Sequence, residues 1–218
     1  MLLEIYNTKV ETETLKQNEN GSDRQKPADD SGLIAGTLVE TSTGWKCVEL
    51  VRAGDMVQTY DGGLRQVKQV QHSYYGVAHG GFEIDQLVHI PGGVLGNCQA
   101  LVMMPDQHLM LQSQLLDDFC GVPNALLPAA AFVGYQGIGA FSPQNVIETV
   151  SMQFEEEELV YANSGMLAHC PVSAGSDFFT VLDVIRAKAL LKLMNCEPAL
   201  LNRAIGCIGR DSSNLWAA

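Results

Sequence analysis

The chain has 218 residues, of which 46% are apolar and 17% charged, so it is long and apolar enough to bury a core. Its formal net charge of −12 repels phosphate backbones, and we expect no nucleic-acid partner. No apolar run approaches the roughly 20 residues of a membrane helix, and no secretory signal opens the chain, so we expect no membrane partner and favour a cytoplasmic location.

Residues 1–31 are predicted to form a polar extension or linker. They include the run QNENGSDRQKPADDS, which cannot bury enough apolar surface to offset the entropy lost on ordering. The apolar start MLLEIY is compatible with one short strand.

From Gly36 onward, short apolar segments alternate with turn residues, a pattern typical of β structure. Residues 37–48 predict a hairpin, and residues 56–60 predict a half-buried strand that ends in a tight Asp-Gly-Gly turn. A long strand is predicted for residues 64–75. Further strands are predicted at 82–90, 100–104, 108–113, 124–128 and 146–162, and one helical turn at 128–133.

The C-terminal part carries a helical pattern. Residues 178–195 place apolar side chains at helical spacing, and Ser176 or Asp177 could cap the start of this helix. A second short helix is predicted at 198–204. We expect the apolar stripe of the first helix to pack on the β structure rather than on a membrane. This stripe consists of Val181, Leu182, Ile185, Ala189 and Leu193.

No cofactor or metal site is expected. The six cysteines form no CxxC pair and no zinc-finger spacing with histidine, and we expect reduced, partly buried thiols. The sequence has no Gly-x-Ser-x-Gly elbow, phosphate-binding loop or dinucleotide fingerprint. The four glutamates at 155–158 predict a solvated strand edge rather than a calcium site, because no DxDxDG loop accompanies them.

Three segments, taken in chain order, share one further pattern. The first combines Gly-Thr at 36–37, Gly-Asp at 54–55 and Asp-Gly-Gly at 61–63. The second is PDQHLML at 105–111, and the third is LVYANSG at 159–165. Together they resemble the opening strands, the Thr/Ser-x-x-His motif and the closing strand of the Hint (hedgehog/intein) domain family. The Asp-Gly-Gly turn resembles the bacterial branch of that family in particular.

This resemblance implies an all-β, Hint-type horseshoe fold with pseudo-twofold halves whose ends meet at a central site. It divides the chain into three parts. We expect a polar N-terminal extension at 1–31, a Hint-like β domain at 32–165, and a helical C-terminal tail at 166–218 that packs on the β domain.

The resemblance also assigns roles to single residues. Hint chemistry begins with a Cys or Ser that attacks the preceding carbonyl. Counting back from the Gly-Thr pair, this position is Gly32, with Ser31 as the alternative if the register slips by one. The motif histidine is present as His108, but the hydroxyl position is Pro105, which has no hydroxyl and no N–H. The other interpretation of His108 is a histidine at the edge of the core, hydrogen-bonded to backbone.

Asn163, followed by Ser164, resembles the intein C-terminal junction, where the Asn amide cyclises onto its own carbonyl and releases the next residue. Ala162 stands where a preceding histidine usually assists, and a second histidine of the bacterial branch falls at Glu157. His108 and Asn163 thus remain as vestigial catalytic residues, while the nucleophile, the hydroxyl and the assisting histidines are missing.

Two functions compete as expectations. The first is a degenerate Hint domain that has lost self-cleavage, is not an enzyme, and serves as a structural or interaction module for a protein partner. The second is a residual autoprocessing protein that cleaves after Asn163 with His108 assisting. A small-molecule or peptide binder that uses the old central cleft is a third possibility.

Overall fold

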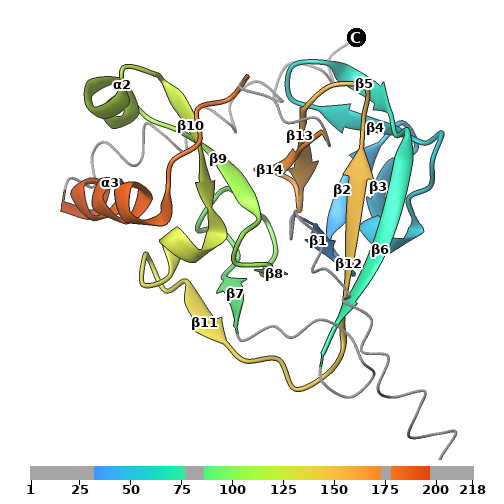
Figure 1. Cartoon of the computed structure of the whole chain (residues 1–218), viewed down its shortest axis with the longest axis horizontal. Helices are drawn as coiled ribbons and strands as arrows, with labels where there is room; N and C mark the ends of the chain where they lie inside the picture. Colours follow the sequence, from blue (N-terminus) through green and yellow to red (C-terminus); the bar gives the residue numbers. More distant parts are fainter. Residues whose placement is uncertain (1–31, 77–85, 173–177, 197–218) are drawn as a thin grey trace, which may run out of the picture.

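The structure is a computed structural model that describes residues 32–76, 86–172 and 178–196. Within these residues the chain forms two antiparallel sheets, with short helices on one side (Figure 1). The predicted all-β fold with a small C-terminal helix is therefore confirmed. Several predicted features lie outside the described residues: the extension at 1–31, the caps Ser176 and Asp177, and the second helix at 198–204.

The first sheet has six strands in the order β11-β7-β8-β1-β12-β6. Its strands are β1 (Leu33–Ile34), β6 (Gln69–Tyr75), β7 (Leu87–Ile90), β8 (Leu101–Met103), β11 (Gly139–Phe141) and β12 (Ile147–Gln153). Leu33 of β1 lies opposite Met103 on one side and Val150 on the other. The first described residues are thus held inside the sheet rather than at its edge.

The second sheet has eight strands, with the order β10-β9-β14-β13-β2-β4-β5 and with β3 paired to β2. Its strands are β2 (Leu38–Thr41), β3 (Gly44–Cys47), β4 (Met56–Thr59), β5 (Gly63–Gln66), β9 (His108–Gln112), β10 (Asn124–Pro128), β13 (Glu158–Ala162) and β14 (Met166–Cys170). β14 was not predicted, yet it lies between β9 and β13. The segment that follows residue 165 therefore begins with an internal strand of the sheet and only later becomes helical.

Residues 64–75 form two strands rather than the single long strand that the sequence predicts. β5 pairs with β4 in the eight-stranded sheet, whereas β6 pairs with β12 in the six-stranded sheet. The chain passes from one sheet to the other at Val67 and Lys68, where Lys68 N–H donates to the Gln153 carbonyl at 2.8 Å. The predicted strand at 146–162 is likewise divided into β12 and β13, one in each sheet.

Among the described residues, three short helical segments accompany the sheets. The 3-10 turn η3 (Ala129–Phe132) confirms the helical turn predicted at 128–133, and η1 (Val48–Leu50) follows β3. The helix α2 (Gln114–Cys120) was not predicted. The Ser113 hydroxyl caps its start by accepting from Leu115 N–H at 3.2 Å, and Gly121 ends it with a φ of 72°.

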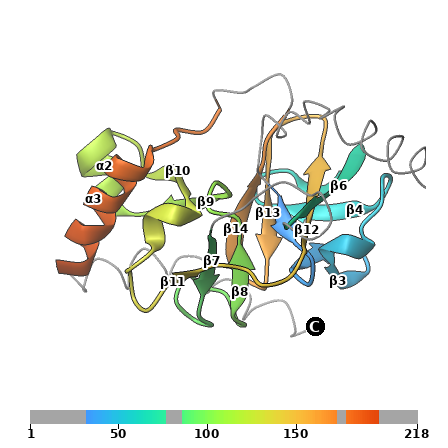
Figure 2. The same ribbon diagram turned by 60° about the horizontal axis from the view of Figure 1, so that its bottom comes forward.

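The helix α3 (Val184–Cys196) begins later than predicted, because Asp183 caps it by accepting from Arg186 N–H at 2.8 Å. It packs against η3 and β10 at the side of the β structure (Figure 2). Its buried side chains are Ala187, Leu190, Leu191 and Met194. The predicted stripe was wrong in rotation, because Ile185 is 82% exposed. None of the described helices has the length and apolar composition needed to cross a membrane.

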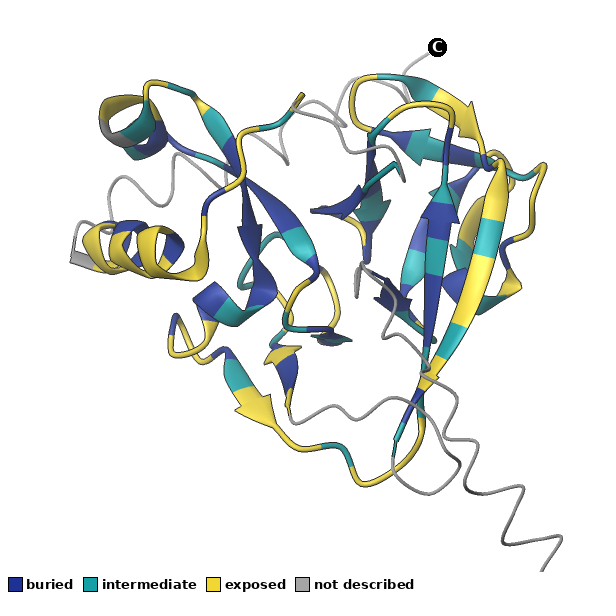
Figure 3. Cartoon of the chain, viewed as in Figure 1, coloured by how far each residue is buried: buried dark blue, intermediate teal, exposed yellow. Residues whose placement is uncertain are grey.

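The main core draws on both sheets and on α3. Buried residues gather along the central strands, while much of β6 and the outer side of α3 are exposed (Figure 3). This core positions the residues at the ends of β1, β9, β13 and β14, where the predicted site residues lie.

Candidate functional site

Gly32, the predicted nucleophile position, is buried beside β12. A Cβ atom built on Gly32 would lie 3.0 Å from the Ser151 hydroxyl oxygen and 3.3 Å from the Thr149 Cβ. Both separations are tighter than ordinary van der Waals contact, so a side chain at this position would require the Ser151 and Thr149 side chains to shift by a few tenths of an ångström. Ser31, the alternative nucleophile, lies outside the described residues.

Asn163 lies in the turn between β13 and β14 and is buried. Its side-chain Oδ1 accepts from Leu38 N–H at 2.8 Å, and its own N–H donates to the Leu38 carbonyl at 2.9 Å. Its carbonyl accepts from Cys98 N–H at 3.0 Å. The φ of Asn163 is 45°, a left-handed conformation that asparagine tolerates better than most residues. Asn163 therefore ties the turn to β2 and to the loop before β8.

A thiol lies beside the next residue of this turn. The Cys98 Sγ and the Ser164 Oγ are 2.9 Å apart, and Ser164 has a φ of 82°. Gly165 follows, and a Cβ atom there would collide with the Gly96 carbonyl oxygen. Cys98 belongs to no sequence motif, and only the folded chain brings residue 98 to residues 163–165.

His108 is half-buried at the start of β9 and lies across from Pro128 of β10. The pairing of Leu109 with Ala168 places His108 beside His169 of β14, and the two rings meet edge to face with centroids 6.2 Å apart. Asn163 lies beyond the opposite end of β14, which is at least roughly 10 Å away at about 3.3 Å per residue. The structure therefore does not bring His108 and Asn163 together.

Pro105, at the predicted hydroxyl position, lies in the turn before β9. Its carbonyl accepts from Ala130 N–H at 2.9 Å, and the turn closes through Gln107 N–H donating to the Met104 carbonyl at 3.1 Å. The Gln107 side-chain amide continues inward and donates to the backbone carbonyls of His108 at 3.0 Å and His169 at 2.9 Å. The Pro105 carbonyl and the Gln107 amide groups are thus used in hydrogen bonds that hold this turn to its neighbours.

Glu157 and His169 form a buried polar pair that the sequence analysis missed. Glu157 Oε1 lies 2.5 Å from His169 Nε2, and the two side chains are only 5% and 9% exposed. The His169 ring also meets Phe179 edge to face, with centroids 6.2 Å apart. The solvated strand edge predicted for residues 155–158 is wrong at Glu157 and at Glu158, whose side chain is 8% exposed. No local sequence pattern indicates this pair, because only the β13–β14 hairpin brings His169 beside Glu157.

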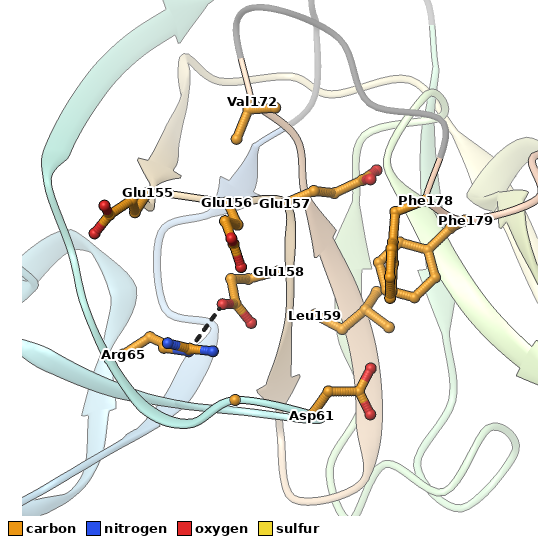
Figure 4. A pocket seen from close by; sticks show the side chains of 11 residues that line it. Asp61, Arg65, Glu155, Glu156, Glu157, Glu158, Leu159, Val172, Phe178 and Phe179 are labelled. Carbon is orange, nitrogen blue, oxygen red and sulfur yellow. Dashed lines mark ion pairs between the residues drawn. The ribbon is translucent and has the colours of Figure 1, made fainter.

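A pocket of about 580 Å³ opens beside Glu157 (Figure 4). Five carboxylates and one guanidinium line it, namely Asp61, the glutamates at 155–158, and Arg65. Arg65 Nε lies 3.2 Å from Glu158 Oε1, and Phe178 and Phe179 form the apolar wall on the opposite side. The pocket is therefore acidic on one side and aromatic on the other.

The remaining titratable groups are dispersed. Within residues 32–76, 86–172 and 178–196, no group of three or more His, Cys, Asp or Glu side chains is arranged to hold a metal ion. Cys47, Cys98, Cys120 and Cys170 are free thiols. Cys170 is buried, and desolvation raises the pKa of its thiol to about 12.

Comparison with known proteins gives one family match and several structural likenesses. The model of a family described as "Hint domain" matches residues 31–168, whereas no curated protein matches. A GSH-linked, splice-inactive variant of the AceL NrdHF class 3 split intein has a TM-score of 0.45 and 16% identity, covering 66% of this chain and 99% of that one.

Two further solved structures are similar. A bacterial intein-like domain from Clostridium thermocellum has a TM-score of 0.44 and 13% identity, covering 64% of this chain and 98% of that one. The gp41-1 intein has a TM-score of 0.37 and 14% identity over 64% and 98% of the two chains.

Proposed function

Because this chain belongs to the Hint domain family, we propose that it is a Hint domain that has lost self-cleavage and serves as a structural or interaction module. On this proposal the chain is not an enzyme. The domain extends through β14, which completes the eight-stranded sheet, and the helical tail follows it.

The environment of Gly32 carries the proposal. The family's first step needs a nucleophilic side chain at this position, and glycine has none. The side chains of Thr149 and Ser151 also crowd the space that a side chain at this position would enter. Pro105 in place of the hydroxyl residue, and the distance between His108 and Asn163, support the same conclusion from independent places in the fold.

Intact-mass measurement tests the proposal. The purified chain is incubated for several days with and without a thiol reagent, and then denatured before analysis so that fragments held by the sheets separate. We expect only the 23.6 kDa chain under both conditions. A fragment that ends near residue 31 would contradict the proposal.

Cleavage after Asn163 is the second candidate function, and the geometry of the turn favours it. Asn163 and Ser164 both have positive φ angles, a conformation that serine rarely adopts. Cys98 N–H already donates to the Asn163 carbonyl, where negative charge would develop. In this reaction the Asn163 side-chain nitrogen attacks its own backbone carbonyl, the bond to Ser164 breaks, and Ser164 leaves as a free amine that gains the proton.

The same denatured samples distinguish the two candidates. Cleavage after Asn163 predicts a C-terminal fragment that begins at Ser164 and that Asn163→Ala abolishes. Cys98→Ser, which keeps the backbone donor, should leave the fragment unchanged. Formation of the fragment in Asn163→Ala would exclude cyclisation.

A further inference from the structure

Glu157 has one carboxylate oxygen that the fold leaves without a partner. Oε1 lies beside His169 Nε2, but Oε2 is buried and accepts no hydrogen bond from the described residues. The side chain as a whole is only 5% exposed. Buried polar atoms almost always have a partner, because an unpaired one loses its hydration without compensation. The unsatisfied acceptor Oε2 therefore points to a ligand that donates a hydrogen bond.

The pocket beside Glu157 has the charge to attract a cationic donor. Its acidic side carries five carboxylates against the single guanidinium of Arg65. Arg65 is engaged by Glu158 at 3.2 Å, and the nearby Lys68 lies 3.5 Å from Glu155. These two basic side chains are thus committed to Glu158 and Glu155, and neither of them pairs with Glu157.

The opposite wall suits an apolar stem. Phe178 and Phe179 meet edge to face with ring centroids 4.8 Å apart, and Figure 4 shows the Glu157 carboxylate extending toward them. Phe178 is 74% exposed, an unusual position for a large apolar ring. Aromatic faces attract ammonium groups and pack well against methylene chains.

We propose that this pocket binds a primary ammonium group on an aliphatic stem, as found in a lysine side chain or a free diamine. The ammonium donates to Glu157 Oε2, and the stem packs against Phe178 and Phe179. A volume of about 580 Å³ lies in the range of small-ligand sites and far exceeds the space of a bare ion. The described residues provide no set of three metal-ligating side chains here.

This inference goes beyond the proposed function and does not depend on it, because the pocket does not include Gly32 or Asn163. Loss of self-cleavage is scored by intact mass, whereas the pocket is scored by binding. Either idea can therefore fail while the other stands.

The test is a calorimetric titration of the full chain with 1,5-diaminopentane and with the N-acetylated pentapeptide Gly-Ser-Lys-Ser-Gly, whose one ammonium group is that of the lysine. We expect saturable binding at one site, and at least a tenfold weaker affinity for Glu157→Gln. Glu155→Gln is the matched control, because it removes the same charge from the same pocket at a side chain that is 83% exposed. Its affinity should stay within threefold of the original.

The two probes separate the possible sources of the ligand. Tighter binding of the pentapeptide assigns the pocket to a lysine of a protein partner, and tighter binding of the diamine assigns it to a free amine. A pentapeptide with norleucine in place of lysine keeps the stem without the charge, and it should not bind.

Three results would overturn the proposal: no saturable binding of either probe, equal weakening by Glu157→Gln and Glu155→Gln, or undiminished binding of the norleucine peptide. If Glu157→Gln does not fold, as judged by circular dichroism, Phe178→Ala takes its place. That substitution lies at an exposed ring, and we expect it to weaken binding at least threefold. Unchanged affinity in a folded Phe178→Ala protein would also contradict the proposal.

Discussion

His169 on β14 lies beside His108 on β9, with ring planes at 89° and centroids 6.2 Å apart. The ring of His108 thus contacts His169, and it does not meet Asn163. This contact joins the motif histidine to Glu157 through His169, and so to the acidic pocket. The Glu157–His169 pair and the pocket therefore lie near the end of β14 that is far from Asn163.

The first prediction concerns the buried pair of His169 and Glu157. His169→Ala should lower the free energy of unfolding by roughly 3 kcal/mol, because it leaves a buried carboxylate with neither oxygen paired. His72→Ala is the matched control, since His72 pairs with Glu148 at 2.7 Å with the two side chains 38% and 29% exposed. It should cost less than about 1 kcal/mol. Urea denaturation measures both, and equal losses would show that burial of the pair does not matter.

The second prediction concerns the filled space at Gly32. Gly32→Ala should destabilise the chain by roughly 1–3 kcal/mol, because the new methyl group meets Thr149 and Ser151. Gly139→Ala places a methyl group on the same sheet with no atom within 4 Å and without a positive φ. That control should be neutral or slightly stabilising. A Gly32→Ala protein as stable as the Gly139→Ala protein would mean that the space is open.

The third prediction concerns the structural role of Asn163. Asn163→Ala should cost roughly 2 kcal/mol, because it removes the acceptor for Leu38 N–H and places alanine in a left-handed conformation. Asn163→Asp keeps an acceptor oxygen and a residue that tolerates this conformation, and it should cost clearly less. Thermal unfolding of the two variants measures the difference. If Asn163→Asp destabilises the chain more than Asn163→Ala, the lost hydrogen bond to Leu38 N–H does not explain the effect.

The parts of the fold that the sequence predicted well are those with local signals. The hairpin at 37–48 and the strand at 56–60 have clear turn residues, and they correspond to β2–β3 and β4, of which β2 and β4 alternate in burial. The strand at 124–128 is a short apolar run and corresponds to β10. β14 escaped prediction because all five of its residues are buried, which leaves no alternation to detect. The helix α2 is only seven residues long, too short for a periodic pattern.

The candidate site was harder to predict, because it depends on strand register. Gly32, Pro105, His108 and Asn163 could be named from motifs, but motifs do not say which side chains meet. Glu157 reaches His169 only through the β13–β14 hairpin, and Cys98 reaches Ser164 across 66 positions of sequence. Such long-range contacts are properties of the tertiary fold and leave no local trace.

The fourth prediction concerns Cys170, whose thiol pKa is raised by burial from 9.0 to about 12. The folded chain keeps this proton while the unfolded chain loses it, so the stabilising effect is complete below pH 9 and declines as the pH rises towards 12. Stability should fall over this window by at most about 1.4 kcal/mol per pH unit from this group. Cys170→Ala should show a flatter decline in urea denaturation between pH 9 and 11. Parallel slopes in the two proteins would refute the assignment.

The same burial predicts selective alkylation. Burial raises the pKa of the Cys170 thiol and shields it from solvent, so iodoacetamide should leave it unmodified in the folded chain at pH 8. Cys98 is exposed and should react before Cys170. Peptide mapping by mass spectrometry after short exposures measures the order. Early modification of Cys170 would indicate that β14 opens readily.

The position of β14 between β9 and β13 also bears on what happens to the chain beyond Asn163. Both neighbouring strands precede Asn163 in sequence, and α3 packs on η3 and β10, which precede it as well. The segment after Asn163 is therefore an integral part of the packed domain and not an appendage at its end. If the backbone were cut in the 163–165 turn, the two fragments would stay associated through the strand pairs of β14 and the packing of α3, and they would migrate together under native conditions.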